Sequence, residues 1–230
     1  MAAKDNCSSH RSEDYDQEIR NTIPYYDSFH SETINMVKTI IKEPEIWLDT
    51  GCGTGTLVKK AIEEFDNTSF IISDPSPQML DLARTKLPAL PEERLRILEP
   101  AETSVISLDP DLKPDVVTAI QAHHYLSQDE RAKTTRVCYD MLKEGGVYIT
   151  FENIRPKTEK GIAVVKEYVK NYQLTMGRDA DTVDNFLKRF DVEFFPITVQ
   201  EHLLLLEKTG FKVVELFWMS YMQAGFYCIK

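Results

Sequence analysis

Between residues 45 and 151, five short apolar runs alternate with segments of helical periodicity. The runs have the length and composition of buried β-strands and lie at 45–49, 69–73, 95–98, 115–120 and 147–151. Helical patterns lie between and after them, at 56–65, 76–86, 128–142 and 199–208. Two final apolar runs, at 211–218 and 222–229, predict an antiparallel pair of strands. This alternation predicts an α/β fold in which a mostly parallel sheet has helices on both faces.

Three segments lie outside this alternation. Residues 157–190 are helical in pattern and longer than a standard crossover, so we expect an inserted helical cover over the carboxyl edge of the sheet. Residues 17–43 predict one or two cover helices over the same edge. Residues 1–16 are polar and rich in Ser and Asp, which predicts a disordered tail rather than a signal peptide. We expect residues 17–230 to form a single domain.

Composition narrows the class of partner. Hydrophobic residues make up 42% of the chain and charged residues 28%, as in a globular protein, and the formal net charge is −10. Proteins that bind nucleic acid through phosphates normally present a basic face, so the charge favours a small molecule or a protein as partner. No apolar stretch is long enough to span a membrane. The four cysteines are scattered and none has metal-ligand spacing, so we expect reduced thiols, no metal and a cytoplasmic location.

A glycine-rich turn follows the first predicted strand. The strand ends at Asp49, and the sequence continues Thr50-Gly51-Cys52-Gly53-Thr54-Gly55 before a predicted helix. Glycines in such a loop allow positive φ and a close approach of the backbone to a ligand. The G-x-G-x-G spacing differs from the dinucleotide pattern G-x-G-x-x-G. The loop therefore indicates either a ligand cradle or a tight turn without a ligand.

An acidic residue ends the second predicted strand. Asp74 lies where doubly wound sheets place a carboxylate that binds the ribose hydroxyls of an adenosine. The alternative is a residue that caps the helix beginning near Pro75. Together with the glycine loop, Asp74 favours an adenosine-containing ligand at the carboxyl edge.

Four motifs in this order resemble those of the class I S-adenosylmethionine-dependent methyltransferases and together span residues 45–152. They are Trp47-Leu48-Asp49-Thr50-Gly51-Cys52-Gly53-Thr54-Gly55, Ser73-Asp74-Pro75-Ser76-Pro77-Gln78-Met79-Leu80, Pro114-Asp115-Val116-Val117 and Leu142-Lys143-Glu144-Gly145-Gly146-Val147. The resemblance implies a Rossmann-like, seven-stranded sheet whose last strand is antiparallel. It also implies S-adenosylmethionine as cofactor and methyl transfer as the reaction.

The resemblance also implies which residues bind the cofactor. Gly51 and Gly53 would contact its methionine part, with Asp49 and Cys52 in the same turn, and Asp74 would bind the ribose. Pro75 and Met79 would lie beside the adenosine. The segment Pro100-Ala101-Glu102 lies at the adenine edge, where the family commonly has an aspartate at the position of Pro100. Ile120 and Gln121 would border the methionine part and the methyl group.

The flanking segments resemble a narrower group, the carboxy-S-adenosylmethionine synthases, which modify the cofactor with prephenate, and small-molecule methyltransferases close to them. The similarity lies in Ile23-Pro24-Tyr25-Tyr26 and in Ile197-Thr198-Val199-Gln200-Glu201-His202. Tyr26 aligns with a tyrosine that reaches the cofactor. Ile120 stands where the synthases have a cofactor-binding asparagine, and only Arg189 or Arg178 is near the position of their carboxylate-binding arginine. These departures favour a methyltransferase with a small-molecule acceptor over the synthase.

Candidates for acid–base chemistry follow the fourth predicted strand. His123 and His124 lie at the carboxyl edge, and one of them, His123 before His124, is a candidate general base. The alternative is that the pair caps a helix or packs at the rim. We expect His30 to be a surface or packing residue.

Aromatic residues are candidates for an acceptor pocket. Tyr25, Tyr26, Tyr168 and Tyr172 either line such a pocket under the covers or belong to ordinary amphipathic packing. A non-catalytic protein that binds S-adenosylmethionine or its demethylated product is a third possibility beside methyltransferase and synthase. The oligomeric state stays open, with a homodimer among the options.

Overall fold

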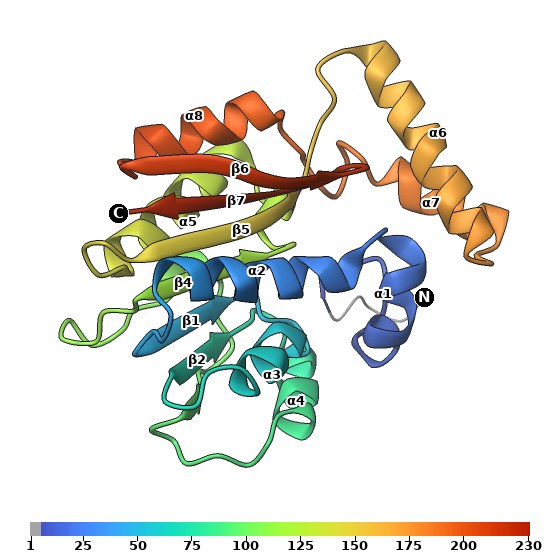
Figure 1. The fold of residues 1–230 in the computed structure, drawn as a ribbon. Coiled ribbons are helices and arrows are strands. Elements are labelled where there is room, and N and C mark those ends of the chain that lie inside the picture. The colour runs from blue at the N-terminus through green and yellow to red at the C-terminus, as the bar shows by residue number, and fades with distance from the viewer. Residues whose placement is uncertain (1–5) are drawn as a thin grey trace.

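The structure, a computed structural model, describes residues 6–230 and contains one seven-stranded sheet (Figure 1). Its strands are β1 (Ile46–Thr50), β2 (Ser69–Ser73), β3 (Leu95–Ile97), β4 (Val116–Ile120), β5 (Val147–Asn153), β6 (Val213–Ser220) and β7 (Gln223–Ile229). The strand order is β3-β2-β1-β4-β5-β7-β6, with β7 antiparallel to both neighbours and the other pairs parallel. The predicted Rossmann-like α/β sheet with its antiparallel last strand is confirmed.

The described residues form eight α-helices. They are α1 (Tyr15–Thr22), α2 (Tyr26–Ile40), α3 (Thr56–Ile62), α4 (Pro77–Lys86), α5 (Gln128–Met141), α6 (Glu159–Thr175), α7 (Ala180–Lys188) and α8 (Val199–Thr209). Three short 3-10 helices accompany them, namely η1 (Ser12–Asp14), η2 (Thr103–Val105) and η3 (His123–Tyr125). None of the helices in residues 6–230 is long and apolar enough to cross a membrane.

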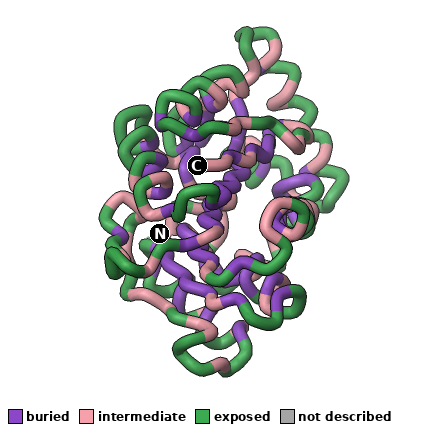
Figure 2. The backbone as a smooth tube through the Cα atoms, turned by 60° about the vertical axis from the view of Figure 1, so that its left-hand side comes forward, coloured by how far each residue is buried: buried purple, intermediate pink, exposed green. Residues whose placement is uncertain are grey.

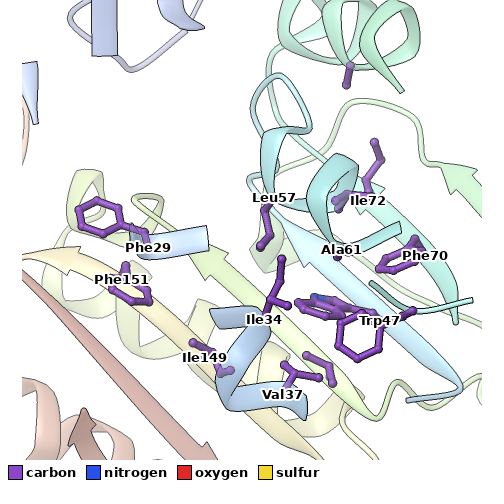
Figure 3. Close-up of a cluster of buried hydrophobic side chains, with 14 of the residues drawn as sticks. Phe29, Ile34, Val37, Trp47, Leu57, Ala61, Phe70, Ile72, Ile149 and Phe151 are labelled. Carbon is purple, nitrogen blue, oxygen red and sulfur yellow. The ribbon is translucent and has the colours of Figure 1, made fainter. Parts of the chain in front are cut away.

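The alternation of side chains along the strands gives two hydrophobic cores, one on each face. On one face, Trp47 and Phe151 pack with residues of α2 and α3, and Figure 3 shows Ile34 of α2 beside Trp47. On the other face, Leu48 and Tyr148 pack with residues of α5 and α8. The central strands β1, β4 and β5 are buried almost throughout, whereas the edge strands β3 and β6 are partly exposed, so buried backbone lies in the middle of the molecule (Figure 2). A sheet covered on both faces is what the uninterrupted apolar strands require.

Local capping fixes where the helices begin. The side chain of Ser76 accepts a hydrogen bond from the backbone N–H of Met79, and Pro77 occupies the first turn of α4, so the predicted N-cap is confirmed. Ser127 and Glu130 form a capping box at the start of α5. These caps place the loops before α4 and α5 at the carboxyl edge of the sheet.

Two expectations about the N-terminal region differ from the structure. We expected α2 over the carboxyl edge, but it lies along one face of the sheet, where Phe29 stacks on Phe151 with ring centroids 4.9 Å apart (Figure 1). We expected a disordered tail over residues 1–16. Residues 1–5 lie outside the described residues, whereas 6–14 run across the carboxyl edge and contain η1, and α1 begins at Tyr15. We call residues 6–14 the N-terminal strap.

The strap is held by distant parts of the chain. Arg189 donates to the carbonyl oxygen of Cys7 at 2.7 Å, and the His10 ring is hydrogen-bonded to the Thr22 hydroxyl at 2.8 Å. Just after the strap, the carboxylate of Asp16 forms an ion pair with Lys86 of α4. A polar segment is therefore ordered by contacts that hydrophobic patterning does not reveal.

Candidate functional site

A cavity of about 640 Å³ opens at the carboxyl ends of β1, β2 and β4. Its wall contains the glycine loop (residues 51–55), the turn after β2, the turn after β4 and part of the strap. The strand order reverses between β1 and β4, and ligands of open α/β sheets bind at such a switch point. A second pocket of about 30 Å³ lies against the same glycine loop.

The glycine loop needs its glycines for two different reasons. Gly51 has φ +66°, and a Cβ built on it would lie 2.8 Å from the Cβ of Ala122, so the two loops meet too closely for a side chain. Gly53 has φ +54°, and a Cβ there would meet nothing within 4 Å. Since Gly53 lines both pockets, its open side is free for a ligand to contact the backbone.

Asp74 is positioned by the backbone around it. One carboxylate oxygen accepts from the N–H of Gly53 at 2.9 Å and the other from the N–H of Ser76 at 2.9 Å. Burial raises the pKa of Asp74, and these two hydrogen bonds oppose the rise. A carboxylate has about four acceptor sites, so two remain for donors such as ribose hydroxyls.

Asp49 lies deeper, at the end of β1. It is 2% exposed and accepts a hydrogen bond from the Thr118 hydroxyl at 2.6 Å. Burial raises its pKa to about 7 although this hydrogen bond lowers it, and the charge of Asp74 adds to the rise. Asp49 faces the smaller pocket together with Tyr26 and Cys52.

The turn after β4 is held in an unusual conformation. Gln121 has φ +56°, and both its backbone N–H and its side-chain amide donate to the carbonyl oxygen of Phe151. Its side-chain oxygen Oε1 is buried without a hydrogen-bond partner among the described residues. Gln121 also lines the larger cavity, so a residue of its wall carries an acceptor that the described residues leave unsatisfied.

His123 and His124 have different surroundings. His123 lines the larger cavity, and its Nδ1 lies 3.2 Å from the Tyr148 hydroxyl, while Nε2 is buried with no partner in the described part of the chain. Burial lowers the pKa of His123, although the charge of Glu152 partly opposes this, so the ring is neutral near pH 7. His124 is instead engaged by Glu152, which lies 2.8 Å from its Nδ1.

Glu152 organises the whole turn. Its two oxygens accept the backbone N–H groups of His123 and His124 at 3.1 and 2.9 Å and the Thr150 hydroxyl at 2.7 Å. Burial by itself raises the pKa of Glu152, but the hydrogen bond with His124 and nearby charges hold it at about 2. The carboxylate therefore stays ionised and fixes η3 at the cavity wall.

Most residues expected from sequence come together at the two pockets. The larger cavity is lined by Gly51, Gly53, Asp74, Pro75, Met79, Glu102, Ile120, Gln121 and His123, and the smaller pocket adds Tyr26, Asp49 and Cys52. Pro100 and Ala101 line neither pocket. The N–H of Ala101 donates to the carbonyl oxygen of Asp74 at 3.2 Å, so this segment supports the turn after β2.

Several lining residues were missed. Tyr15 borders both pockets, and the strap contributes Asn6, Cys7 and Ser8. The composition of the first 16 residues suggested disorder, and no local pattern marks them as a wall. Thr103 of η2 and Lys133 of α5 also line the cavity, and only the packing of these elements brings them there.

The expected acceptor pocket under residues 157–190 needs correction. None of these residues lines either pocket; instead Gln173 and Tyr172 donate to the carbonyl oxygens of Thr22 and Arg20 at 3.1 and 2.8 Å. The insertion thus supports α1 from outside.

The expected tyrosines of this pocket also lie elsewhere. Tyr168 stacks on Tyr221 with centroids 4.0 Å apart, and Tyr25, at 62% exposure, has its ring centroid 6.4 Å from that of Tyr221. Both tyrosines are exposed, and they and Tyr172 lie outside the two pockets. Of the four candidate tyrosines, Tyr26 faces a pocket.

Comparisons with known proteins agree with this architecture. Residues 48–148 match the family model of a methyltransferase domain. The carboxy-S-adenosyl-L-methionine synthase of Nautilia profundicola is 21% identical over 202 residues, covering 88% of this chain and 84% of that protein. An uncharacterized methyltransferase of Bacillus licheniformis is 26% identical over 160 residues, covering 67% of this chain and 71% of that protein.

Solved structures show the same fold. Human N-acetylserotonin methyltransferase, solved with S-adenosylmethionine, superposes with a TM-score of 0.61 at 16% identity. The superposition covers 94% of this chain and 57% of the human chain, so this protein spans little more than half the length of the human enzyme. Magnesium protoporphyrin IX methyltransferase from Synechocystis was solved with S-adenosylhomocysteine and superposes with a TM-score of 0.59 at 13% identity. The superposition covers 90% of this chain and 83% of that chain. Residues 48–148 are thus a methyltransferase domain, and the strand order and the glycine-loop cavity give the chain the fold of S-adenosylmethionine-dependent methyltransferases.

Proposed function

We propose that this protein transfers the methyl group of S-adenosylmethionine to a small-molecule acceptor. The observation that carries the proposal is the cavity of about 640 Å³ at the carboxyl edge, a volume typical of small-ligand sites. Residues 6–8 of the strap line it, and Lys133 is the only cationic side chain among its described lining residues. A cavity of this size without a basic lining suits a small acceptor better than a nucleic acid.

The cofactor supplies a methyl group on a sulfonium, which is already a good leaving group. The chain's task is therefore to bind, orient and exclude water. We assign the backbone of Gly51 and Gly53, with Asp49 and Cys52 behind them, to the methionine part and Asp74 to the ribose. The remaining proposed contacts are Tyr26, Pro75, Met79, Glu102, Ile120 and Gln121, while Pro100 and Ala101 support the turn after β2 from outside the two pockets.

We assign His123 the role of general base for an acceptor that must lose a proton. Support comes from its place on the cavity wall, the lowered pKa that keeps the ring neutral, and an Nε2 without a partner among the described residues. If Nδ1–H donates to the Tyr148 hydroxyl, the lone pair on Nε2 is free to take the proton. His124 is a poorer candidate because Glu152 already engages its ring.

The synthase alternative rests on the sequence relatives, several of which are carboxy-S-adenosyl-L-methionine synthases. A bound carboxylate calls for a cation, yet the described lining of both pockets contains no arginine. The Arg189 side chain donates to Glu193 and to the carbonyl oxygen of Cys7, and the Arg178 side chain donates to Gln173. The two candidate arginines thus have other partners, which favours methyl transfer.

Mass spectrometry separates the possibilities. The purified protein is incubated with S-adenosylmethionine and either a panel of phenols, amines and carboxylic acids or prephenate. We expect S-adenosylhomocysteine to form with at least one panel compound. A heavier cofactor species formed only with prephenate would overturn the proposal in favour of a synthase, and tight cofactor binding without turnover in any mixture would overturn it in favour of a non-catalytic binding protein.

A further inference from the structure

The smaller pocket is a polar chamber on the inner side of the glycine loop. It shares Tyr15, Gly51, Gly53 and Ile120 with the larger cavity, so the two adjoin. Its volume of about 30 Å³ is enough for one small polar group or a water molecule. A ligand in the larger cavity is thus able to extend only a terminal group into it.

His30 gives this chamber an unpaired polar atom. The residue is 3% exposed and lies on α2, one turn after Tyr26, whose ring it contacts edge-on at a centroid distance of 5.0 Å. Its Nδ1 is buried and has no hydrogen-bond partner within residues 6–230. We expected a surface or packing residue, but packing alone would place an apolar side chain here, because an unpaired buried nitrogen is destabilising.

The surroundings of His30 suit a neutral donor. Burial lowers the pKa of His30 to about 3, with Lys60 adding to the effect and Asp27 opposing it, so the imidazole is uncharged near pH 7. The hydroxyl groups of Tyr15 and Tyr26 lie 3.3 Å apart, and both residues line the chamber. One side of the chamber therefore presents neutral N–H and O–H groups.

Asp49 lines the same chamber from the end of β1. A pocket whose lining contains both a carboxyl group and neutral donors is a complementary environment for an α-amino acid terminus. The ammonium group pairs with carboxyl and carbonyl oxygens, and the carboxylate needs N–H or O–H donors. Gly51 and Gly53 line both this chamber and the larger cavity that contains Asp74. A short aliphatic chain that connects a ribose at Asp74 to a group in the chamber would therefore lie along the glycine loop.

We propose that His30, together with Tyr26, binds the α-carboxylate at the end of S-adenosylmethionine, which enters the chamber behind the glycine loop. The inference rests on the proposed orientation of the cofactor, with its ribose at Asp74. It assigns a function to the side chain of α2 whose buried nitrogen has no hydrogen-bond partner among the described residues.

Ligand truncation tests the assignment. S-adenosylhomocysteine carries the amino-acid end, whereas 5′-methylthioadenosine has the adenosine and the sulfur without it. His30→Leu removes the polar atoms, and His30→Asn keeps a donor near the position of Nδ1. By calorimetry, His30→Leu is expected to weaken S-adenosylhomocysteine binding about tenfold or more and to leave 5′-methylthioadenosine unchanged, with His30→Asn keeping most of the affinity.

The possible results distinguish the role of His30 from the proposed orientation of the cofactor. Unchanged S-adenosylhomocysteine affinity in His30→Leu, or an equal loss for both ligands, would overturn the role of His30. Asp74→Ala is expected to weaken both ligands; failure of the wild type to bind either would instead overturn the cofactor orientation. If His30→Leu does not fold, wild-type protein must still prefer S-adenosylhomocysteine about tenfold over its analogue without the α-carboxylate, and equal affinity would refute the inference.

Discussion

The carboxylate of Asp74 accepts a hydrogen bond from the backbone N–H of Gly53 at 2.9 Å, across 21 residues of sequence. This contact joins the turn after β2 to the glycine loop after β1, and it fixes both relative to the cavity. The two sequence features that first indicated an adenosine ligand are thus parts of one hydrogen-bonded unit.

Replacing Asp74 tests the ribose contact. Asp74→Ala leaves ribose hydroxyls without an acceptor in a site where the native residue is 8% exposed, so cofactor affinity is expected to fall by about 1–3 kcal/mol, roughly tenfold or more. Isothermal titration with S-adenosylhomocysteine measures the change. Asp81→Ala, on the exposed side of α4, is the matched control and is expected to bind like wild type. Equal affinities for the two variants would show that the ribose lies elsewhere.

Gly53→Ala tests whether the open side of the glycine loop is a ligand contact. Its new Cβ meets no protein atom within 4 Å, so the variant is expected to fold but to bind the cofactor at least about tenfold more weakly. Gly145 is a matched control because it also has positive φ and free space at its Cβ position, yet lies in the turn before β5. Both variants share the backbone penalty of roughly 1 kcal/mol in unfolding free energy. A binding loss in Gly145→Ala as large as in Gly53→Ala would contradict this account.

His123→Ala is expected to reduce turnover about 100-fold with little change in cofactor affinity, if the acceptor must lose a proton. A base works when neutral, so wild-type activity should rise with pH to a plateau, with an apparent pKa below 6.5 because burial lowers that of His123. The variant should lose this limb of the profile. A pH profile that keeps the same limb after substitution would mean that another group titrates.

Asp49 makes stability depend on pH in a defined direction. Its pKa is about 7 in the folded protein against 3.8 for the free group, so the folded state binds the proton more tightly. Stability conferred by the protonated form is therefore lost as pH rises from about 4 to about 7, by roughly 1.4 kcal/mol for each pH unit in that interval. Asp49→Asn, which is neutral throughout, should lack this loss.

Urea unfolding followed by the fluorescence of buried Trp47 compares the two proteins across this pH range. The difference in unfolding free energy, variant minus wild type, is expected to grow with pH and then level off. Parallel stability curves would show that the pKa of Asp49 is not raised in the folded state.

Much of the sheet followed from sequence because its signals are local. The apolar run before Asp49 lies within one residue of β1, and Ser76 caps α4 as its sequence context indicated. The antiparallel closing pair was likewise visible as two apolar runs with a short turn. Periodicity and capping chemistry are properties of neighbouring residues, so a single sequence reveals them.

The rest depends on contacts between distant segments. Tyr15 lines the cavity because Asp16 pairs with Lys86 and the insertion holds α1, and none of this is encoded in the polar composition of the first 16 residues. His30 looked like a packing residue because helical periodicity predicts only that it lies on the buried face of α2. Periodicity does not reveal that this part of the face borders the smaller, polar pocket. The sequence located the glycine loop and Asp74, whereas the lining by Tyr15 and the strap was visible only in the tertiary structure.

The most direct test of the central claim is a calorimetric titration of the folded wild-type chain with S-adenosylmethionine and S-adenosylhomocysteine, repeated with Asp74→Ala. We predict one site per chain for both ligands in the wild type and a loss of about tenfold or more in the variant. Absence of binding by the folded wild type would contradict the account.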